Sequence, residues 1–146
     1  MAAIAPNWRT LPHAIVCTLL AAILPASAKP RADDLRSTLT YFCSALANGN
    51  PTDAMSTVSK SYVRYSELSD RLSALTASYD IATEVEVNDE VETQVEGNLS
   101  VAFTLVLTDR ATGESKRRTR SLEIRFRRES GKWKIATMDG GGLFSP

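Results

Sequence analysis

Two carboxylates and two tyrosines are the side chains of this chain best suited to acid–base chemistry. Glu67 and Asp80 are candidate general bases, because a carboxylate shielded from water holds its proton more strongly and can then exchange it near neutral pH. Tyr62 and Tyr65 are candidate hydrogen-bond donors to a substrate. A pocket that buried one such carboxylate beside a tyrosine would support isomerase-like or hydrolase-like catalysis, which is one hypothesis for this protein.

Imidazole chemistry is lost if the N-terminus is removed on export. The only histidine, His13, lies in a segment with an apolar run at 14–24 and the small residues Ala26-Ser27-Ala28. This is the pattern of a signal peptide, so we expect cleavage after Ala28 and a secreted or periplasmic protein with no stable membrane anchor; an uncleaved anchor is the alternative. Without His13, Ser-His-Asp and Cys-His nucleophiles and the common zinc sites are excluded. We expect no metal and no cofactor.

The charge and cysteine content limit the kinds of partner and the thiol chemistry that we expect. The chain carries 17 basic and 17 acidic residues, a balance that gives no support for nucleic-acid binding by bulk charge. Residues 84–96 are acidic and 110–128 are basic, which indicates either pairing across a solvated sheet face or a basic strip at 116–120 that binds an anionic partner or envelope polymer. Cys43, the one cysteine left after cleavage, is expected to be a buried, inert thiol.

Helical patterns occupy the first part of the mature chain. Apolar residues recur at helical spacing over 33–48, and Asn50 before Pro51 predicts the cap of a short second helix. A third helical stretch runs from about Ser66 to Ser78. The helices therefore precede every predicted strand.

Strand patterns follow. Alternating side chains over 81–95 and 99–107, a third run ending at Arg127, and a last strand with Trp133 predict about four antiparallel strands. Three N-terminal helices packed on one face of this curved sheet make an α+β domain over residues 29–138. The remaining residues, 139–146, are predicted to form a flexible tail.

Two stretches resemble the nuclear transport factor 2-like superfamily, which includes SnoaL-like and ketosteroid-isomerase-like domains. They are Phe42-Cys43-Ser44-Ala45-Leu46-Ala47-Asn48-Gly49-Asn50, similar to the family's first-helix ending, and Gly131-Lys132-Trp133-Lys134-Ile135. The resemblance implies a cone-shaped fold with a pocket at its wide end and frequent dimerisation through the outer face of the sheet.

The same resemblance can be tested at catalytic positions. The isomerase tyrosine would fall on Phe42, which has no donor, and the isomerase aspartate near Ser66, which is no base at neutral pH. The Asp-His pair of SnoaL-like cyclases needs a histidine that the mature chain lacks. The resemblance therefore implies the scaffold without those two activities.

These observations favour an exported, non-catalytic module that binds a small molecule or a protein. Its pocket is predicted to involve Phe42, Tyr62, Tyr65 and Glu67, its ligand to be small and apolar, and the protein to be a homodimer. The alternatives are the carboxylate–tyrosine enzyme described above and an envelope-binding protein that uses the basic strip.

Overall fold

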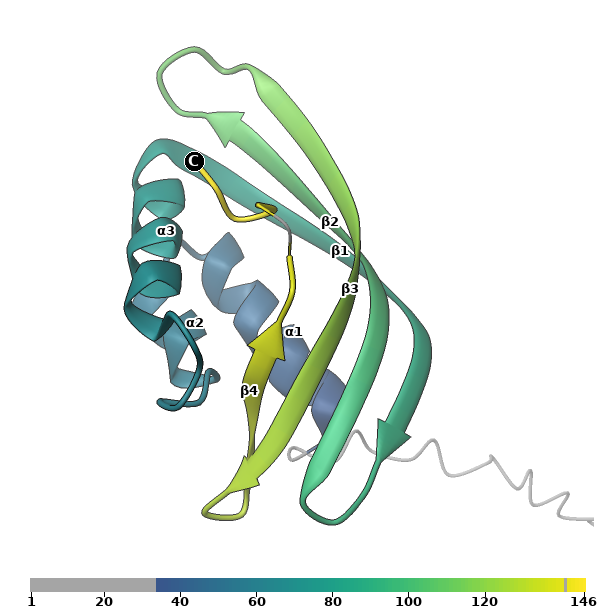
Figure 1. Cartoon of the computed structure of the whole chain (residues 1–146). Coiled ribbons are helices and arrows are strands. Elements are labelled where there is room, and N and C mark those ends of the chain that lie inside the picture. Colours follow the sequence, from purple (N-terminus) through teal and green to yellow (C-terminus); the bar gives the residue numbers. More distant parts are fainter. Residues whose placement is uncertain (1–33, 141) are drawn as a thin grey trace, which may run out of the picture.

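The computed structural model describes residues 34–140 and 142–146, so the predicted signal peptide lies outside the described residues. Three helices precede four strands, and the helices cover the concave side of a curved sheet (Figure 1). This is the α+β arrangement expected from the sequence. The elements are α1 (Leu35–Ala47), α2 (Pro51–Ser56), α3 (Tyr65–Ser78), β1 (Tyr79–Glu92), β2 (Glu96–Asp109), β3 (Ser115–Glu129) and β4 (Lys132–Met138).

Local capping sets where the first two helices begin. The carboxylate of Asp34 accepts a hydrogen bond from the Ser37 amide at 2.6 Å, and the Asn50 side chain accepts from the Asp53 amide at 3.0 Å. Each bond satisfies a helical N–H group that has no partner within its helix.

Helix α3 begins at Tyr65, one residue before the predicted start at Ser66. The residue before it, Arg64, has left-handed backbone angles (φ 64°) and no capping side-chain bond. Its carbonyl accepts from the Leu68 amide at 3.0 Å. A sharp backbone turn, rather than a side-chain cap, therefore starts this helix.

The four strands pair in sequence order, each antiparallel to the next. Bulges interrupt the register at Asn88 in β1, between Val87 and Asp89, and at Ala136 in β4, opposite Arg125 and Phe126 of β3. A bulge bends its strand and increases the local twist, which accounts for the curvature visible in Figure 1.

Strand β4 is much shorter than β3. It pairs only with residues 124–129 of β3, so residues 115–123 have no strand on that side within the described part of the chain. Beyond Ser56, the loop after α2 completes the pairing of β4: the Ile135 amide donates to Thr57 O, and the Ser59 amide donates to Ile135 O, both at 2.8 Å. This half of the sheet is closed by a continuous backbone network.

The core lies between the helices and the concave face of the sheet. Phe42 and Leu72 meet Phe103 and its neighbours on β2, and all of them are fully buried. Trp133 is also buried, with the Arg128 guanidinium 4.7 Å from its ring centroid. Trp133 thus lies in the last strand, as predicted from the sequence.

The residues predicted to form a flexible tail pack into this core instead. Leu143 and Phe144 are 2% and 5% exposed, and Figure 1 shows the segment entering the space between the helices and the sheet. The glycines at 140–142 suggested mobility, but burial of the following apolar pair decides its position. We call residues 139–146 the C-terminal segment.

The helices described here are all too short or too polar to span a bilayer, which is a statement about residues 34–140 and 142–146 only.

Candidate functional site

A hollow of about 380 Å³ lies between α3 and the residues that follow β4. One wall comes from the start and first turns of α3, and the other from Met138 and the C-terminal segment. We call it the α3 hollow. Its lining includes Tyr62, Arg64, Glu67, Leu68, Arg71, Met138, Asp139, Leu143 and Phe144.

Tyr62 spans the two walls of the α3 hollow. The half-buried phenol donates a hydrogen bond to the Met138 carbonyl at 3.0 Å. Burial raises the pKa of Tyr62 above its usual value of 10.0, because an apolar environment disfavours the phenolate. Tyr62 is therefore a protonated donor whose hydrogen is already shared with the backbone.

Glu67 lies in the same hollow but is engaged by two arginines. Its carboxylate pairs with Arg71 one turn further along α3 and lies 3.7 Å from the Arg64 guanidinium. The side chain remains 43% exposed. The carboxylate is therefore an ion-paired surface group and not a desolvated base.

Asp80, the other candidate base, lies away from the α3 hollow. It pairs with Arg110 at 2.9 Å, and its side chain is 73% exposed. Among the described residues no aspartate or glutamate is buried. The enzyme hypothesis needs a buried carboxylate, and within the described part of the chain it has none.

The other two predicted pocket residues have different surroundings. Phe42 is buried and does not line the hollow, but its ring packs in edge-to-face geometry against Phe144, with centroids 6.0 Å apart. Tyr65 does not line the hollow: Lys60 lies over its ring at 4.7 Å and donates to its hydroxyl at 3.1 Å. The structure thus brings Tyr62 and Glu67 together in the hollow. Phe42 lies behind Phe144, which forms part of the lining.

Cys43 faces β1 from helix α1 and is buried. Burial raises the pKa of its thiol to about 11, against a small opposite effect of a hydrogen bond with Thr83. The thiol is therefore protonated at neutral pH, as expected for an inert core cysteine.

The basic strip is divided between the two faces of β3. Arg117 projects from the outer face and pairs with Glu84 of β1 at 2.7 Å, across the intervening β2. Lys116, Arg118 and Arg120 pair in register with Leu107, Leu105 and Phe103, whose side chains are buried on the inner face. The cross-strand pairing explanation therefore holds for Arg117 and not for Arg118.

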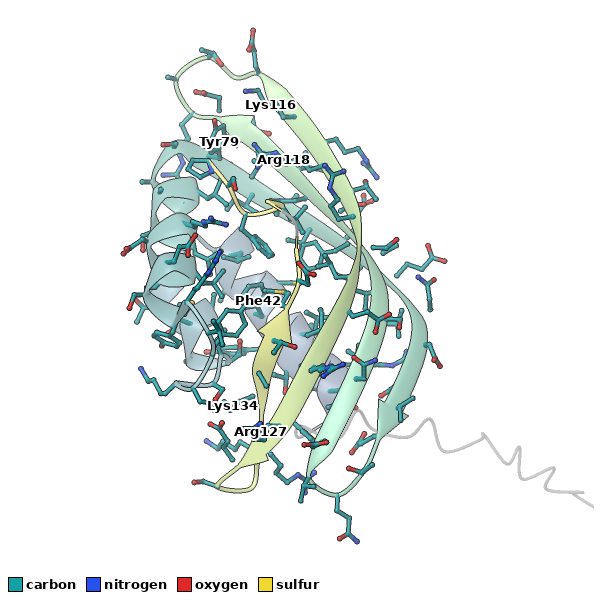
Figure 2. All side chains as sticks on the ribbon, viewed as in Figure 1. Phe42, Tyr79, Lys116, Arg118, Arg127 and Lys134 are labelled. Atoms are coloured by element: carbon teal, nitrogen blue, oxygen red, sulfur yellow. The ribbon has the colours of Figure 1, made fainter. Side chains whose placement is uncertain are left out.

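Sequence reasoning placed Arg118 in the basic strip but not beside the pocket, and it missed Phe144 altogether. Arg118 donates to the carbonyls of Leu143, at 3.2 Å, and of Ser145. Figure 2 shows Arg118 beside the C-terminal segment. The signal for Arg118 was present in the alternation of β3, which places it on the same face as Leu122. Phe144 left no comparable signal beyond being apolar.

Within the described residues, no three histidine, cysteine, aspartate or glutamate side chains gather as a metal site.

A family of regulatory-protein domains matches most of this chain. The profile of the anti-sigma-I factor RsgI9 C-terminal domain matches residues 37–139. The chain belongs to this family. No curated protein sequence matches it.

Solved structures show the same fold at low sequence identity, and they are nuclear transport factor 2-like proteins. A conserved protein from Planctomyces limnophilus DSM 3776 superposes with a TM-score of 0.67 and 13% identity, covering 70% of this chain and 88% of that one. A ketosteroid isomerase-like protein from Erwinia carotovora atroseptica SCRI1043 gives 0.60 and 14%, covering 70% and 88%. A scytalone dehydratase-like protein from Novosphingobium aromaticivorans DSM 12444 gives 0.63 and 8%, covering 71% and 78%.

Proposed function

We propose that this protein is an exported, non-catalytic binding module whose ligand enters the α3 hollow. The observation that carries the proposal is the hollow itself, about 380 Å³ in volume and walled by Tyr62, Leu68 and the C-terminal segment. Its lining mixes apolar side chains, such as Leu68 and Met138, with the charged side chains of Arg64, Glu67, Arg71 and Asp139, and polar groups in a pocket fix the orientation of a ligand. The absence of a buried carboxylate among the described residues supports binding over catalysis.

The family connection supports a regulatory setting for this binding. The matching profile is named for the C-terminal domain of an anti-sigma-I factor. On this proposal the domain works as the ligand-responsive part of a regulatory system rather than as a metabolic enzyme. Export, with cleavage after Ala28, would place it outside the cytoplasm.

A homodimer through the outer face of the sheet is part of the proposal. That face has acidic side chains on β1, such as Glu84 and Glu86, small neutral ones on β2, such as Ala102, and arginines on β3, such as Arg117 and Arg125. A two-fold axis parallel to β2 would place the acidic strand of one copy over the basic strand of the other. Such opposite-charge contacts favour one register of association.

Native mass spectrometry of the protein recovered from an exporting host tests the proposal. We expect a dimer and a reproducible bound mass beyond that of the chain. Val63 is 76% exposed at the rim of the hollow, so Val63→Trp should obstruct the hollow and abolish the bound mass. Val95, 62% exposed near the β1–β2 turn, provides the matched control Val95→Trp, which should retain it.

A bound mass that survives Val63→Trp would place the ligand elsewhere. A bare chain, together with no change in melting temperature across a panel of small organic molecules, would contradict small-molecule binding altogether. A monomer at micromolar concentration would contradict the dimer without bearing on the hollow.

A further inference from the structure

The C-terminal segment places an aromatic ring inside the cone. The ring of Phe144 packs in edge-to-face geometry against Phe42 of helix α1 and Phe103 of strand β2, with centroid distances of 6.0 Å and 5.8 Å. We infer that this segment is a displaceable occupant of the pocket, and that the ligand which exchanges with it is an aromatic carboxylate. The inference rests on the proposed function, because it names the ligand class and the regulation of the same site.

Few contacts hold the segment in place. Its described backbone hydrogen bonds stay within it: the Leu143 amide donates to Gly140 O at 2.8 Å, and the Ser145 amide to Gly142 O at 3.0 Å. Among the described residues, no backbone bond joins residues 140–146 to a strand. The attachment therefore consists of two buried side chains and the Arg118 guanidinium, and such a segment opens at lower cost than the whole domain unfolds.

The slot filled by Phe144 suits another aromatic ring. Both of its ring contacts are edge-to-face, with interplanar angles of 82° to Phe42 and 77° to Phe103. This geometry is favourable because the positive edge of one ring meets the negative face of the next. Leu143 and Phe144 also form part of the wall of the α3 hollow, so release of the segment would join slot and hollow into one cavity.

Arg118 accounts for the carboxylate of the inferred ligand. Its Nη1 donates to the carbonyls on either side of Phe144, and it has no ion pair among the described residues. A guanidinium binds a carboxylate more strongly than neutral carbonyls and in a matching two-pronged geometry. The register of β3 with β2 places Lys116 and Arg120 on the same face as Arg118, where they add positive potential.

A molecule with a ring and a carboxylate a few bonds apart would thus reproduce both contacts of the segment with a stronger acceptor. Because ligand and segment compete for one slot, the apparent affinity is reduced by the fraction of molecules in which the segment is closed. Binding would release the segment, which is a change that a regulatory partner can detect.

Fluorine NMR of the full mature protein tests the exchange directly. The chain has four phenylalanines, so incorporation of 4-fluorophenylalanine gives four signals, and Phe144→Leu identifies that of Phe144. On addition of 3-phenylpropanoate we expect the Phe144 signal to move to a solvent-exposed shift. Phe126, buried where β3 pairs with β4, should not move and serves as the internal reference.

Binding of 3-phenylpropanoate with an unmoved Phe144 signal would overturn the inference and leave the proposed function standing. Absence of binding at millimolar probe would also overturn it. The native mass measurement on the Val63 and Val95 variants would then decide the proposed function separately.

The role of Arg118 is tested by the preference between two probes. Arg118→Met should lower the affinity ratio of 3-phenylpropanoate to the neutral 3-phenylpropanamide by roughly tenfold, because only the charged probe gains from the guanidinium. Arg117→Met is the matched control, since its side chain pairs with Glu84 on the outer face, and it should leave the ratio unchanged. An unchanged ratio in Arg118→Met, or equal losses in both variants, would contradict the carboxylate assignment.

Discussion

The interior of the cone is closed in two different ways, by strand β4 and by the C-terminal segment, and the two differ in what holds them in place. Along residues 124–129 of β3, strand β4 closes the sheet with a ladder of backbone hydrogen bonds that continues into the loop after α2. Beyond that ladder, the C-terminal segment closes it with Leu143, Phe144 and the contacts of Arg118. The ladder can open only with the core, whereas the segment can open alone.

The largest predicted change in stability comes from weakening the packing of β4. Ile135 is fully buried, and its backbone joins β4 to the loop at Thr57. Ile135→Ala should lower the free energy of unfolding by about 3 kcal/mol through lost apolar contact and the cavity left behind. Urea unfolding followed by the fluorescence of Trp133 measures it. The exposed neighbour Thr137→Ala should change stability by less than about 0.5 kcal/mol.

A loss of less than about 1 kcal/mol for Ile135→Ala would mean that β4 is held no more strongly than the C-terminal segment, which contradicts the proposed difference between the two.

The next effect concerns Cys43, a buried residue of α1 that faces β1. Its thiol pKa is raised from 9.0 to about 11 in the folded protein, so the folded state resists ionisation. Stability from this group is fully present below pH 9 and is lost as the pH rises toward 11, by about 2 kcal/mol. Urea unfolding at pH 8 and pH 11, compared between wild type and Cys43→Ala, isolates the loss.

Thiol labelling tests the same point kinetically. At pH 8, Ellman's reagent should react with Cys43 far more slowly than with a buried cysteine introduced by Leu143→Cys in a Cys43→Ala background. Equal rates would show that both parts of the cone open together, which contradicts separate closure.

The smallest effect concerns the segment. Phe→Ala changes in a core usually cost about 3–5 kcal/mol, but Phe144→Ala should cost only about 1–2 kcal/mol, because a detached segment recovers conformational entropy. Urea unfolding gives the value. A cost as large as that of Ile135→Ala would make the segment an integral part of the core.

Much of the fold could be predicted from local patterns. The Asn50–Pro51 cap, the Gly131 turn and the alternation through β2 each depend on neighbours within a few residues, and the structure contains all of them. Helix α3 starts one residue before the predicted position because a left-handed backbone conformation at Arg64, which has no side-chain signal in the sequence, sets its first turn.

The site was less predictable. Tyr62 and Glu67 share the α3 hollow, yet Glu67 is neutralised by Arg64 and Arg71, and Tyr65 pairs with Lys60. These contacts depend on side-chain directions at the start of one helix. Spacing alone cannot distinguish a carboxylate that faces a pocket from one held by arginines at its rim.

Local patterns and composition account for the order of helices and strands, for the alternation that separates Arg117 from Arg118, and for the lack of a histidine after residue 13. These follow from composition and from periods of two and 3.6 residues. The position of the C-terminal segment inside the cone depends instead on long-range packing in the tertiary structure. Phe144 reaches Phe42 and Phe103 across more than 40 residues of chain, and such contacts arise from burial of apolar surface, which carries no local pattern.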